Sequence, residues 1–181
     1  MIYVILANGF EEIEAITPID FLRRADIQVA VCGLGGKIIT GGHGVAVETD
    51  MLFEDIDADK ADMLILPGGK AGVDNMVADG RVAPLCADIL ARGAYLAMIC
   101  AAPSLAGRAG LLKGRKATCY PGFGKFLEGA LYQPDANVVA DGKIITAKAA
   151  GASMEFAHTL CAILAGKETA DKVAAAMFAR V

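Results

Sequence analysis

The residue whose surroundings most suggest chemistry is Cys100, in the run Met98-Ile99-Cys100-Ala101-Ala102-Pro103. An apolar, strand-like segment leads into this cysteine, small residues follow it, and Pro103 suits the first turn of a helix. A sharp strand-to-helix turn of this kind is a nucleophile elbow, which holds one side chain up at the edge of a sheet. The helix dipole and nearby N–H groups favour a thiolate there. On these residues alone, Cys100 is also consistent with the last buried residue of a strand.

A second segment that could form part of a functional site is Leu66-Pro67-Gly68-Gly69. Paired glycines after a buried strand allow close approach of the backbone and a pocket lined by N–H donors. An ordinary turn is the alternative interpretation. Lys70 is not followed by Ser or Thr in a G-x-x-x-x-G-K frame, so the segment is not a nucleotide-binding P-loop.

The third segment is acidic and follows the first apolar run of the chain. Glu11, Glu12 and Glu14 fall in the first turn of an expected helix, where carboxylates usually lie on the surface and interact with the helix dipole. Glu14 comes three residues after Glu11, so one of the two carboxylates can face the ends of the strands.

The elements that must position these segments are short apolar strands alternating with amphipathic helices. Continuous apolarity marks strands that are covered on both faces, as in a parallel sheet. We expect strands over 2–7, 27–32, 63–66, 94–99 and 143–146, and a solvent-facing hairpin strand over 45–48. The expected helices cover 11–25, with a bend at Pro18, and 81–92, 153–164 and 168–180.

This β-α-β order predicts a doubly wound α/β sandwich that forms a single domain over residues 1–181. In such a sheet the functional site lies beyond the carboxyl ends of the strands. The segments that contain Cys100, Gly68-Gly69 and Glu14 each follow a predicted strand, so the fold would bring them together at this edge of the sheet.

Composition and charge exclude several classes of protein. The 181 residues carry 17 Lys and Arg against 21 Asp and Glu, which argues against a general binder of nucleic acid or anionic membranes. The longest apolar run, 94–102, is far shorter than the roughly 20 residues of a membrane span. The start of the chain has no basic region typical of a signal peptide, so we expect a cytoplasmic protein. The five cysteines are scattered without a C-x-x-C, which disfavours disulfides and zinc.

Taken together, four segments resemble the ThiJ/PfpI superfamily, and most closely its branch containing the parkinsonism-associated protein deglycase. The resemblance runs in register over essentially the whole chain. Its motifs are Asn8-Gly9-Phe10-Glu11-Glu12-Ile13-Glu14, Leu66-Pro67-Gly68-Gly69, Ile99-Cys100-Ala101-Ala102-Pro103 and Gly151-Ala152-Ser153-Met154-Glu155-Phe156-Ala157.

The resemblance implies a flavodoxin-like sandwich, a homodimer and a reactive Cys100 that is hydrogen-bonded to a protonated Glu14. The backbone N–H groups of Gly69 and Ala101 would face the sulfur or a bound oxyanion, and Tyr120 and Gly68 are candidates for orienting the substrate. Implied activities are conversion of methylglyoxal to lactate without glutathione, and deglycation of early glyoxal adducts. We expect a small carbonyl substrate, a thiol of lowered pKa, a Glu14 of raised pKa, and neither a cofactor nor a metal.

The sequence departs from the family pattern at two positions. Relatives often carry His where this chain has Tyr120, and a neutral phenol is a poor base near pH 7. Relatives frequently carry Gly where this chain has Ala102. Cys119, beside Tyr120, is either a secondary redox thiol or an inert buried residue. His43 lies in a Gly-rich hairpin that the family places at the dimer interface.

The resemblance also narrows the reaction class. The peptidase-like branch carries His directly after the nucleophile, where this chain has Ala101, and the His-x-Glu pair of glutamine amidotransferases is absent. A cysteine-dependent enzyme acting on α-oxoaldehydes is therefore our first hypothesis. The alternative is a redox sensor without turnover, in which oxidation of Cys100 is the signal.

Overall fold

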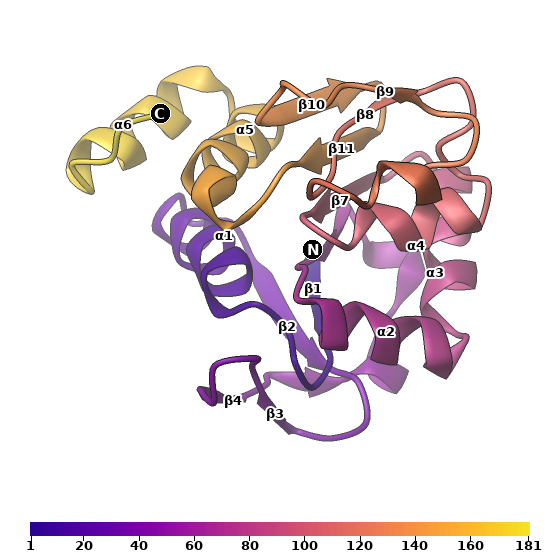
Figure 1. Cartoon of the computed structure of the whole chain (residues 1–181). Helices are drawn as coiled ribbons and strands as arrows, with labels where there is room; N and C mark the ends of the chain where they lie inside the picture. The colour runs from indigo at the N-terminus through magenta and orange to yellow at the C-terminus, as the bar shows by residue number, and fades with distance from the viewer.

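The computed structural model describes residues 1–181 and is built around one seven-stranded sheet (Figure 1). Its strand order is β10-β11-β7-β6-β1-β2-β5, and every neighbouring pair is parallel except β10 with β11. The strands are β1 Ile2–Leu6, β2 Val29–Gly33, β5 Met51–Leu52, β6 Met63–Leu66, β7 Tyr95–Ile99, β10 Val138–Asp141 and β11 Ile144–Ala147.

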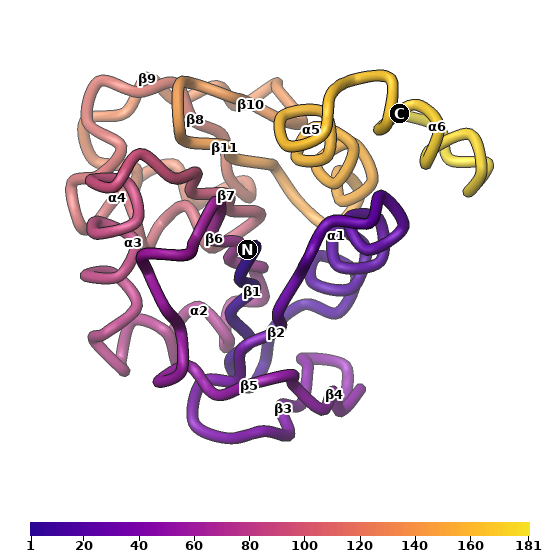
Figure 2. Tube along the Cα trace, turned by 180° about the vertical axis from the view of Figure 1, so that it is seen from behind, coloured from indigo at the N-terminus to yellow at the C-terminus, as the bar shows by residue number.

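Six α-helices cover the two faces of this sheet. They are α1 Glu12–Arg24, α2 Lys70–Asp79, α3 Val82–Ala91, α4 Pro103–Arg108, α5 Ser153–Ala165 and α6 Lys167–Ala176. Helices α1, α5 and α6 cover one face, and α2, α3 and α4 cover the other, as Figures 1 and 2 show from opposite sides. This three-layer arrangement confirms the predicted doubly wound α/β sandwich with a mostly parallel sheet.

The central strands explain why the core divides into two halves. All five residues of β1 are buried, because helices lie on both sides of it. Successive side chains of a strand point to opposite faces. Tyr3 and Ile5 accordingly pack under α2, α3 and α4, whereas Ile2, Val4 and Leu6 pack under α1, α5 and α6.

Two small sheets and four 3₁₀ turns complete the fold. The hairpin strands β3 Ile38–Thr40 and β4 Ala46–Glu48 pair antiparallel, which confirms the predicted strand in this region. Strand β8 Lys116–Ala117 pairs parallel with β9 Leu131–Tyr132. The 3₁₀ turns are Phe53–Asp55, Ala58–Lys60, Gly124–Phe126 and Ala150–Ala152.

The predicted elements differ from the structure mainly at their ends. The five main strands are present with shifts of one or two residues, and α1 continues through Pro18. The last helix ends at Ala176 rather than 180, and Phe178 has a left-handed φ of 53°, which no regular helix contains. Helix α2 was not predicted, because Gly72, Asp74 and Asn75 weaken its helical pattern.

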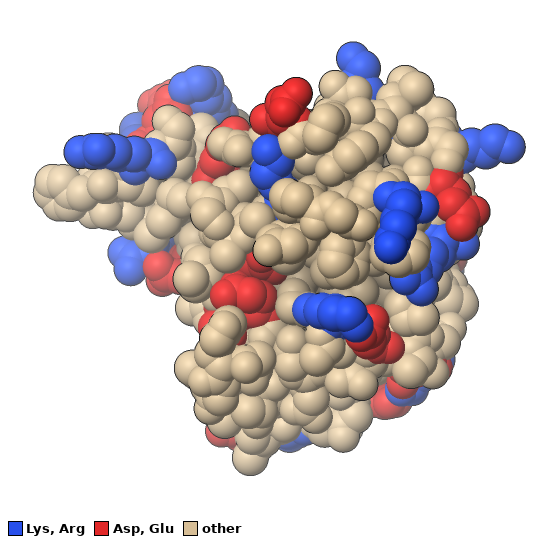
Figure 3. All heavy atoms as spheres, viewed as in Figure 1, with Lys and Arg blue, Asp and Glu red and all other residues tan.

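The surface carries mixed charge. On the face shown in Figure 3, Lys and Arg side chains are scattered, and several lie next to acidic ones. None of the helices has the length and apolar character that crossing a membrane requires.

Candidate active site

The loops that carry the candidate site residues, which follow β1, β6 and β7, meet at the carboxyl ends of these strands. The chain order reverses between β1 and β6, because β2 lies on one side of β1 and β6 on the other. Ligands of open α/β sheets bind at such a switch point. The loop after β1 is tied to the loop after β6 by the hydrogen bond from Glu11 N–H to the Gly68 carbonyl, at 3.1 Å.

Cys100 occupies the sharp turn between β7 and α4 that the sequence predicts. Its φ is 64°, a left-handed value that is uncommon for any residue except glycine. Hydrogen bonds fix this backbone on both sides: Cys100 N–H donates to the Ala147 carbonyl at 2.9 Å, and the Cys100 carbonyl accepts from Tyr120 N–H at 2.8 Å. Cys100 is the one cysteine of the five that is not fully buried, so it is the cysteine a substrate can reach.

Glu14 projects from the first turn of α1 into the interior and has no exposed surface. Its Oε2 accepts a hydrogen bond of 2.9 Å from Gly68 N–H, and the carboxyl group interacts with the Cys100 thiol. Its Oε1 is buried without a hydrogen-bond partner of ordinary geometry. An unpartnered buried carboxylate oxygen is costly unless it holds a proton, and that proton can be shared with the thiol.

The sulfur of Cys100 also faces backbone donors. The N–H groups of Gly69 and Ala101 act on it as hydrogen-bond donors and lower its pKa. Gly69 has a φ of 84°, which glycine adopts without strain. The predicted oxyanion donors therefore lie beside the predicted nucleophile, on the loops that follow β6 and β7.

The acid–base properties of the pair correct one expectation. Burial raises the pKa of Glu14 to about 7, as predicted, and the charge of Glu11 contributes. The prediction of a lowered thiol pKa is wrong for Cys100 beside an ionised Glu14, because burial and the Glu14 carboxylate raise the thiol pKa to about 12.

Two groups that interact this closely titrate as a unit. The pair loses its first proton near pH 7 and holds the second up to high pH. In the singly protonated pair the remaining proton resides either on sulfur or on Glu14. When Glu14 holds it, the opposing charge is gone and the Gly69 and Ala101 donors stabilise the thiolate.

Glu14 also makes the stability of the protein depend on pH. Its folded-state pKa of about 7 lies above the ordinary value of 4.5, so its contribution is fully present at low pH and is lost as the pH rises through 7. We expect this group to lower the free energy of unfolding by about 3 kcal/mol between pH 4 and pH 8. Urea titrations of wild type and Glu14→Gln at both pH values measure it. The wild type should lose more stability than the variant, and equal losses would contradict the raised pKa.

Gly68 has no side chain, which leaves room for the side chains of Cys100 and Glu14 to come into contact. A Cβ at this position would overlap Glu14 Oε2 and would lie 2.6 Å from the Cβ of Cys100. No side chain larger than hydrogen fits between the two residues without displacing one of them.

We therefore expect Gly68→Ala to cost about 1–3 kcal/mol of stability, the usual effect of overpacking. It should also lower the reactivity of Cys100, because the thiol and the carboxyl are pushed apart. Chemical denaturation and alkylation of Cys100 measure the two effects. Gly151→Ala is the matched control, since a Cβ there meets no atom within 4 Å. Equal behaviour of the two variants would contradict the close packing.

Tyr120 and Cys119 lie beside the elbow in different ways. Tyr120 is joined to Cys100 through its backbone. The residue is 46% exposed, and its ring packs edge-on against Phe123 at a centroid distance of 6.2 Å. Cys119 is fully buried, and burial raises the pKa of its thiol to about 11. This environment favours the inert interpretation of Cys119.

His43 lies on the hairpin, next to the start of α1. Its Nδ1 is 2.8 Å from Glu12 Oε2, and this contact raises the pKa of His43. Glu11, Glu12 and His43 offer ligand atoms within 4.8 Å of one another, a convergence that the sequence did not reveal. Glu11 also caps α1 by accepting a hydrogen bond from Glu14 N–H, so hydrogen bonds within the protein already account for this cluster.

The fold and this site define a class of protein: an α/β sandwich with a cysteine at a strained elbow and a buried glutamate beside it. Residues 1–163 match the DJ-1/PfpI family. The chain belongs to this family. It is 38% identical to the Drosophila melanogaster protein dj-1beta over 173 residues, which is 94% of this chain and 92% of that protein.

Other relatives extend the comparison. A deglycase from Pyrococcus abyssi is 31% identical over 151 residues, covering 83% of this chain and 90% of the relative. The crystal structure of Drosophila melanogaster DJ-1beta superposes with a TM-score of 0.95 at 36% identity, covering 99% of this chain and 98% of that one. The oxidized form of Toxoplasma gondii DJ-1 gives a TM-score of 0.93 at 31% identity, with coverages of 99% and 98%.

Proposed function

We propose that this protein is a cysteine-dependent enzyme acting on α-oxoaldehydes such as methylglyoxal, or on their early adducts with proteins. The observation that carries the proposal is the pairing of Cys100, held at a φ of 64°, with the fully buried Glu14. Two relatives named deglycases, from Pyrococcus abyssi and Pyrococcus horikoshii, support this class of substrate.

The reaction begins with addition of the Cys100 thiolate to the aldehyde carbon. A carbon–sulfur bond forms, the carbonyl π bond breaks, and its oxygen takes a proton to give a hemithioacetal. The N–H groups of Gly69 and Ala101, which act as donors toward the Cys100 sulfur, would stabilise the negative charge that develops on this oxygen.

Glu14 then moves a proton between adjacent carbons. As carboxylate it removes the proton from the former aldehyde carbon, and the electron pair of that C–H bond forms an enediol while the former ketone oxygen takes a proton. As acid it returns a proton to the former ketone carbon, and the hydroxyl on the former aldehyde carbon loses its proton as its C=O bond forms. The product is a thioester of lactate with Cys100, which water hydrolyses to lactate and free thiol. A pKa of about 7 suits Glu14 to both steps near neutral pH.

Proton NMR of the purified protein with methylglyoxal, without glutathione or any added cofactor, tests this proposal. We expect catalytic formation of lactate that matches the loss of methylglyoxal. Loss of methylglyoxal into protein adducts, with no lactate, would contradict the proposal.

A redox sensor is the second candidate function, and one observation favours it. Of the five thiols only Cys100 is accessible, so peroxide would oxidise it first. Mass spectrometry after limited peroxide treatment should locate sulfinate on Cys100. Equal oxidation of all five cysteines would contradict selective sensing. Sensing with no lactate formation would favour this candidate over the enzyme.

We further propose a homodimer formed through α1 and the adjacent hairpin. Ile13 and Ile16 on α1 are 55% and 41% exposed, and Ile38 and Val45 on the hairpin segment are 68% and 52% exposed. Such exposed aliphatic side chains fit an interface between subunits.

Size-exclusion chromatography with light scattering tests the dimer. Wild type should elute at twice the chain mass of 18.7 kDa, and Ile13→Glu should shift it toward one chain mass. A monomeric wild type would contradict this arrangement.

The cytoplasmic location stays a prediction from the sequence.

A further inference from the structure

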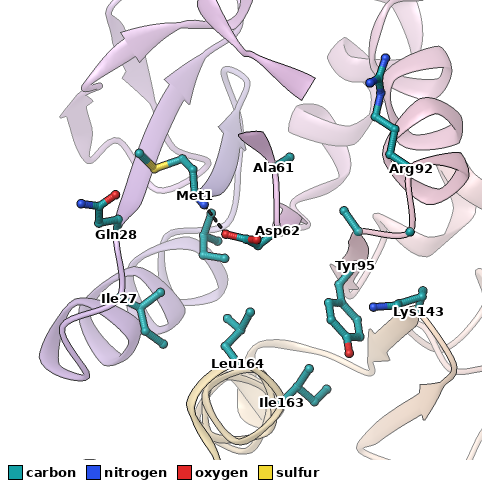
Figure 4. A pocket seen from close by; sticks show the side chains of 13 residues that line it. Met1, Ile27, Gln28, Ala61, Asp62, Arg92, Tyr95, Lys143, Ile163 and Leu164 are labelled. Atoms are coloured by element: carbon teal, nitrogen blue, oxygen red, sulfur yellow. Dashed lines mark hydrogen bonds and ion pairs between the residues drawn. The ribbon is translucent and has the colours of Figure 1, made fainter. Parts of the chain in front are cut away.

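A hollow of about 630 Å³ lies at the amino ends of the central strands, at the opposite end of the sheet from Cys100 (Figure 4). This volume is within the range of small-molecule sites, about 300–1,000 Å³. Strand β7 connects the two places, with Tyr95 at the hollow and Ile99 next to the nucleophile. At about 3.3 Å per residue the strand separates them by roughly 13 Å.

Hydrogen bonds between neighbouring strands use several of the backbone groups at the hollow. Asp62 N–H donates to the Met1 carbonyl and Tyr95 N–H to the Asp62 carbonyl, both at 2.9 Å. Leu96 N–H likewise donates to the Lys143 carbonyl at 2.9 Å. The side chains of the lining decide which ligand charge the hollow favours.

The charged groups of the lining leave one cation without an acidic partner. The Met1 amino group pairs with Asp62, as Figure 4 shows. Arg92 pairs with Asp88 at 2.9 Å and also with Asp59, and its guanidinium points away from the hollow. Lys143 contacts no carboxylate, and its Nζ lies 3.7 Å from the centroid of the Tyr95 ring.

The remaining walls are apolar. Ile27 precedes β2, and Ile163 and Leu164 come from the last turn of α5. All three are half-buried, and Figure 4 shows Leu164 projecting between Ile27 and Tyr95. The Tyr95 hydroxyl has no hydrogen-bond partner within the protein, and it projects from the end of the ring against which the Lys143 ammonium lies (Figure 4). The hollow thus combines one cation that has no carboxylate partner and one free hydroxyl with aliphatic walls.

We propose that this hollow binds a small organic monocarboxylate with an aliphatic body. The carboxylate interacts with the Lys143 ammonium and the Tyr95 hydroxyl, and the aliphatic part lies against Ile163 and Leu164. Charge complementarity selects an anion, and the apolar walls select an organic one over an inorganic one. This site is independent of the proposed reaction at Cys100.

Calorimetric titration with sodium octanoate tests the proposal. Wild type should bind one octanoate per chain, and Lys143→Gln should bind it about five- to tenfold more weakly, the effect of a partly exposed charged contact. Tyr95→Phe should weaken binding by a smaller factor, because it removes only the hydroxyl. Lys113→Gln is the matched control, since Lys113 is another exposed lysine without an ion pair. Octylamine, with the same aliphatic chain and the opposite charge, should bind worse than octanoate.

Amide chemical shifts locate the bound octanoate. We expect the shifts of Tyr95, Lys143 and Leu164 to change and those of the Cys100 loop to stay fixed. No binding to wild type at millimolar octanoate would overturn the proposal. Equal affinity of Lys143→Gln and Lys113→Gln, or shift changes confined to other parts of the chain, would also overturn it.

Discussion

Cys100→Ser is expected to lower kcat/KM for methylglyoxal by at least about 10³-fold. Serine is close in size to cysteine, so the elbow and its hydrogen bonds should persist. A hydroxyl ionises far less readily than a thiol, and Glu14, with a pKa of about 7, is too weak a base to activate it. Initial rates of lactate formation for wild type and variant measure the loss.

Cys161→Ala is the control for this substitution. Cys161 is fully buried on α5, under the face of the sheet covered by α1, α5 and α6, and takes no part in the site. Its removal should leave the rate within a few-fold of wild type. A Cys100→Ser protein that retains most of the activity would show that the reaction does not pass through this thiol.

Glu14→Gln is expected to lower kcat by about 10²- to 10⁴-fold, the usual loss when a positioned acid or base is removed. Glutamine keeps the shape of the side chain, and its amide oxygen can still accept the hydrogen bond from Gly68 N–H. The amide cannot take up or release the proton that the reaction moves. The rate of wild type should also rise through about pH 7, as the pair loses its first proton, and the variant should lack this step.

Glu12→Gln provides the comparison, because it makes the same chemical change in the same helical turn. Glu12 contacts His43 and not Cys100. Its loss should change kcat by no more than a few-fold. Equal loss of activity in the two variants would mean that Glu14 acts only through the structure of α1.

The sequence was most informative where backbone geometry and residue type agree. The apolar run before Cys100 and the Pro103 after it predicted the elbow, and the structure shows it with a left-handed φ at Cys100. Gly68 and Gly69 follow a strand at the same edge of the sheet, so topology alone brings them to Cys100. These features depend on local pattern and on strand order, which can be read from a single chain.

Features that depend on three-dimensional packing could not be predicted in the same way. Helix α2 contains Gly72, whose missing side chain allows close packing against the backbone of Gly9 and Phe10, so its helical pattern is weak. The raised thiol pKa follows from the burial of Cys100 and from the charge of Glu14, which are properties of the folded pair. The contact of His43 with Glu12 joins residues 31 positions apart.

The hollow beside Lys143 could not be predicted from the sequence pattern either. Its lining comes from the starts of several strands and from the end of α5, and none of these positions carries a motif. Its position at the amino ends of the strands also lies outside the region where ligands of this fold class usually bind.

The most direct test of the proton shared by Cys100 and Glu14 is the rate of Cys100 alkylation by iodoacetamide as a function of pH, followed by peptide mass spectrometry. We expect Cys100 to react faster than the four buried cysteines, and its rate to rise to a plateau with a midpoint near pH 7. Glu14→Gln should abolish or displace this step, because the shared proton is lost. A Cys100 that reacts no faster than Cys119, or whose rate rises only above about pH 10 as for an isolated buried thiol, would contradict the shared-proton pair.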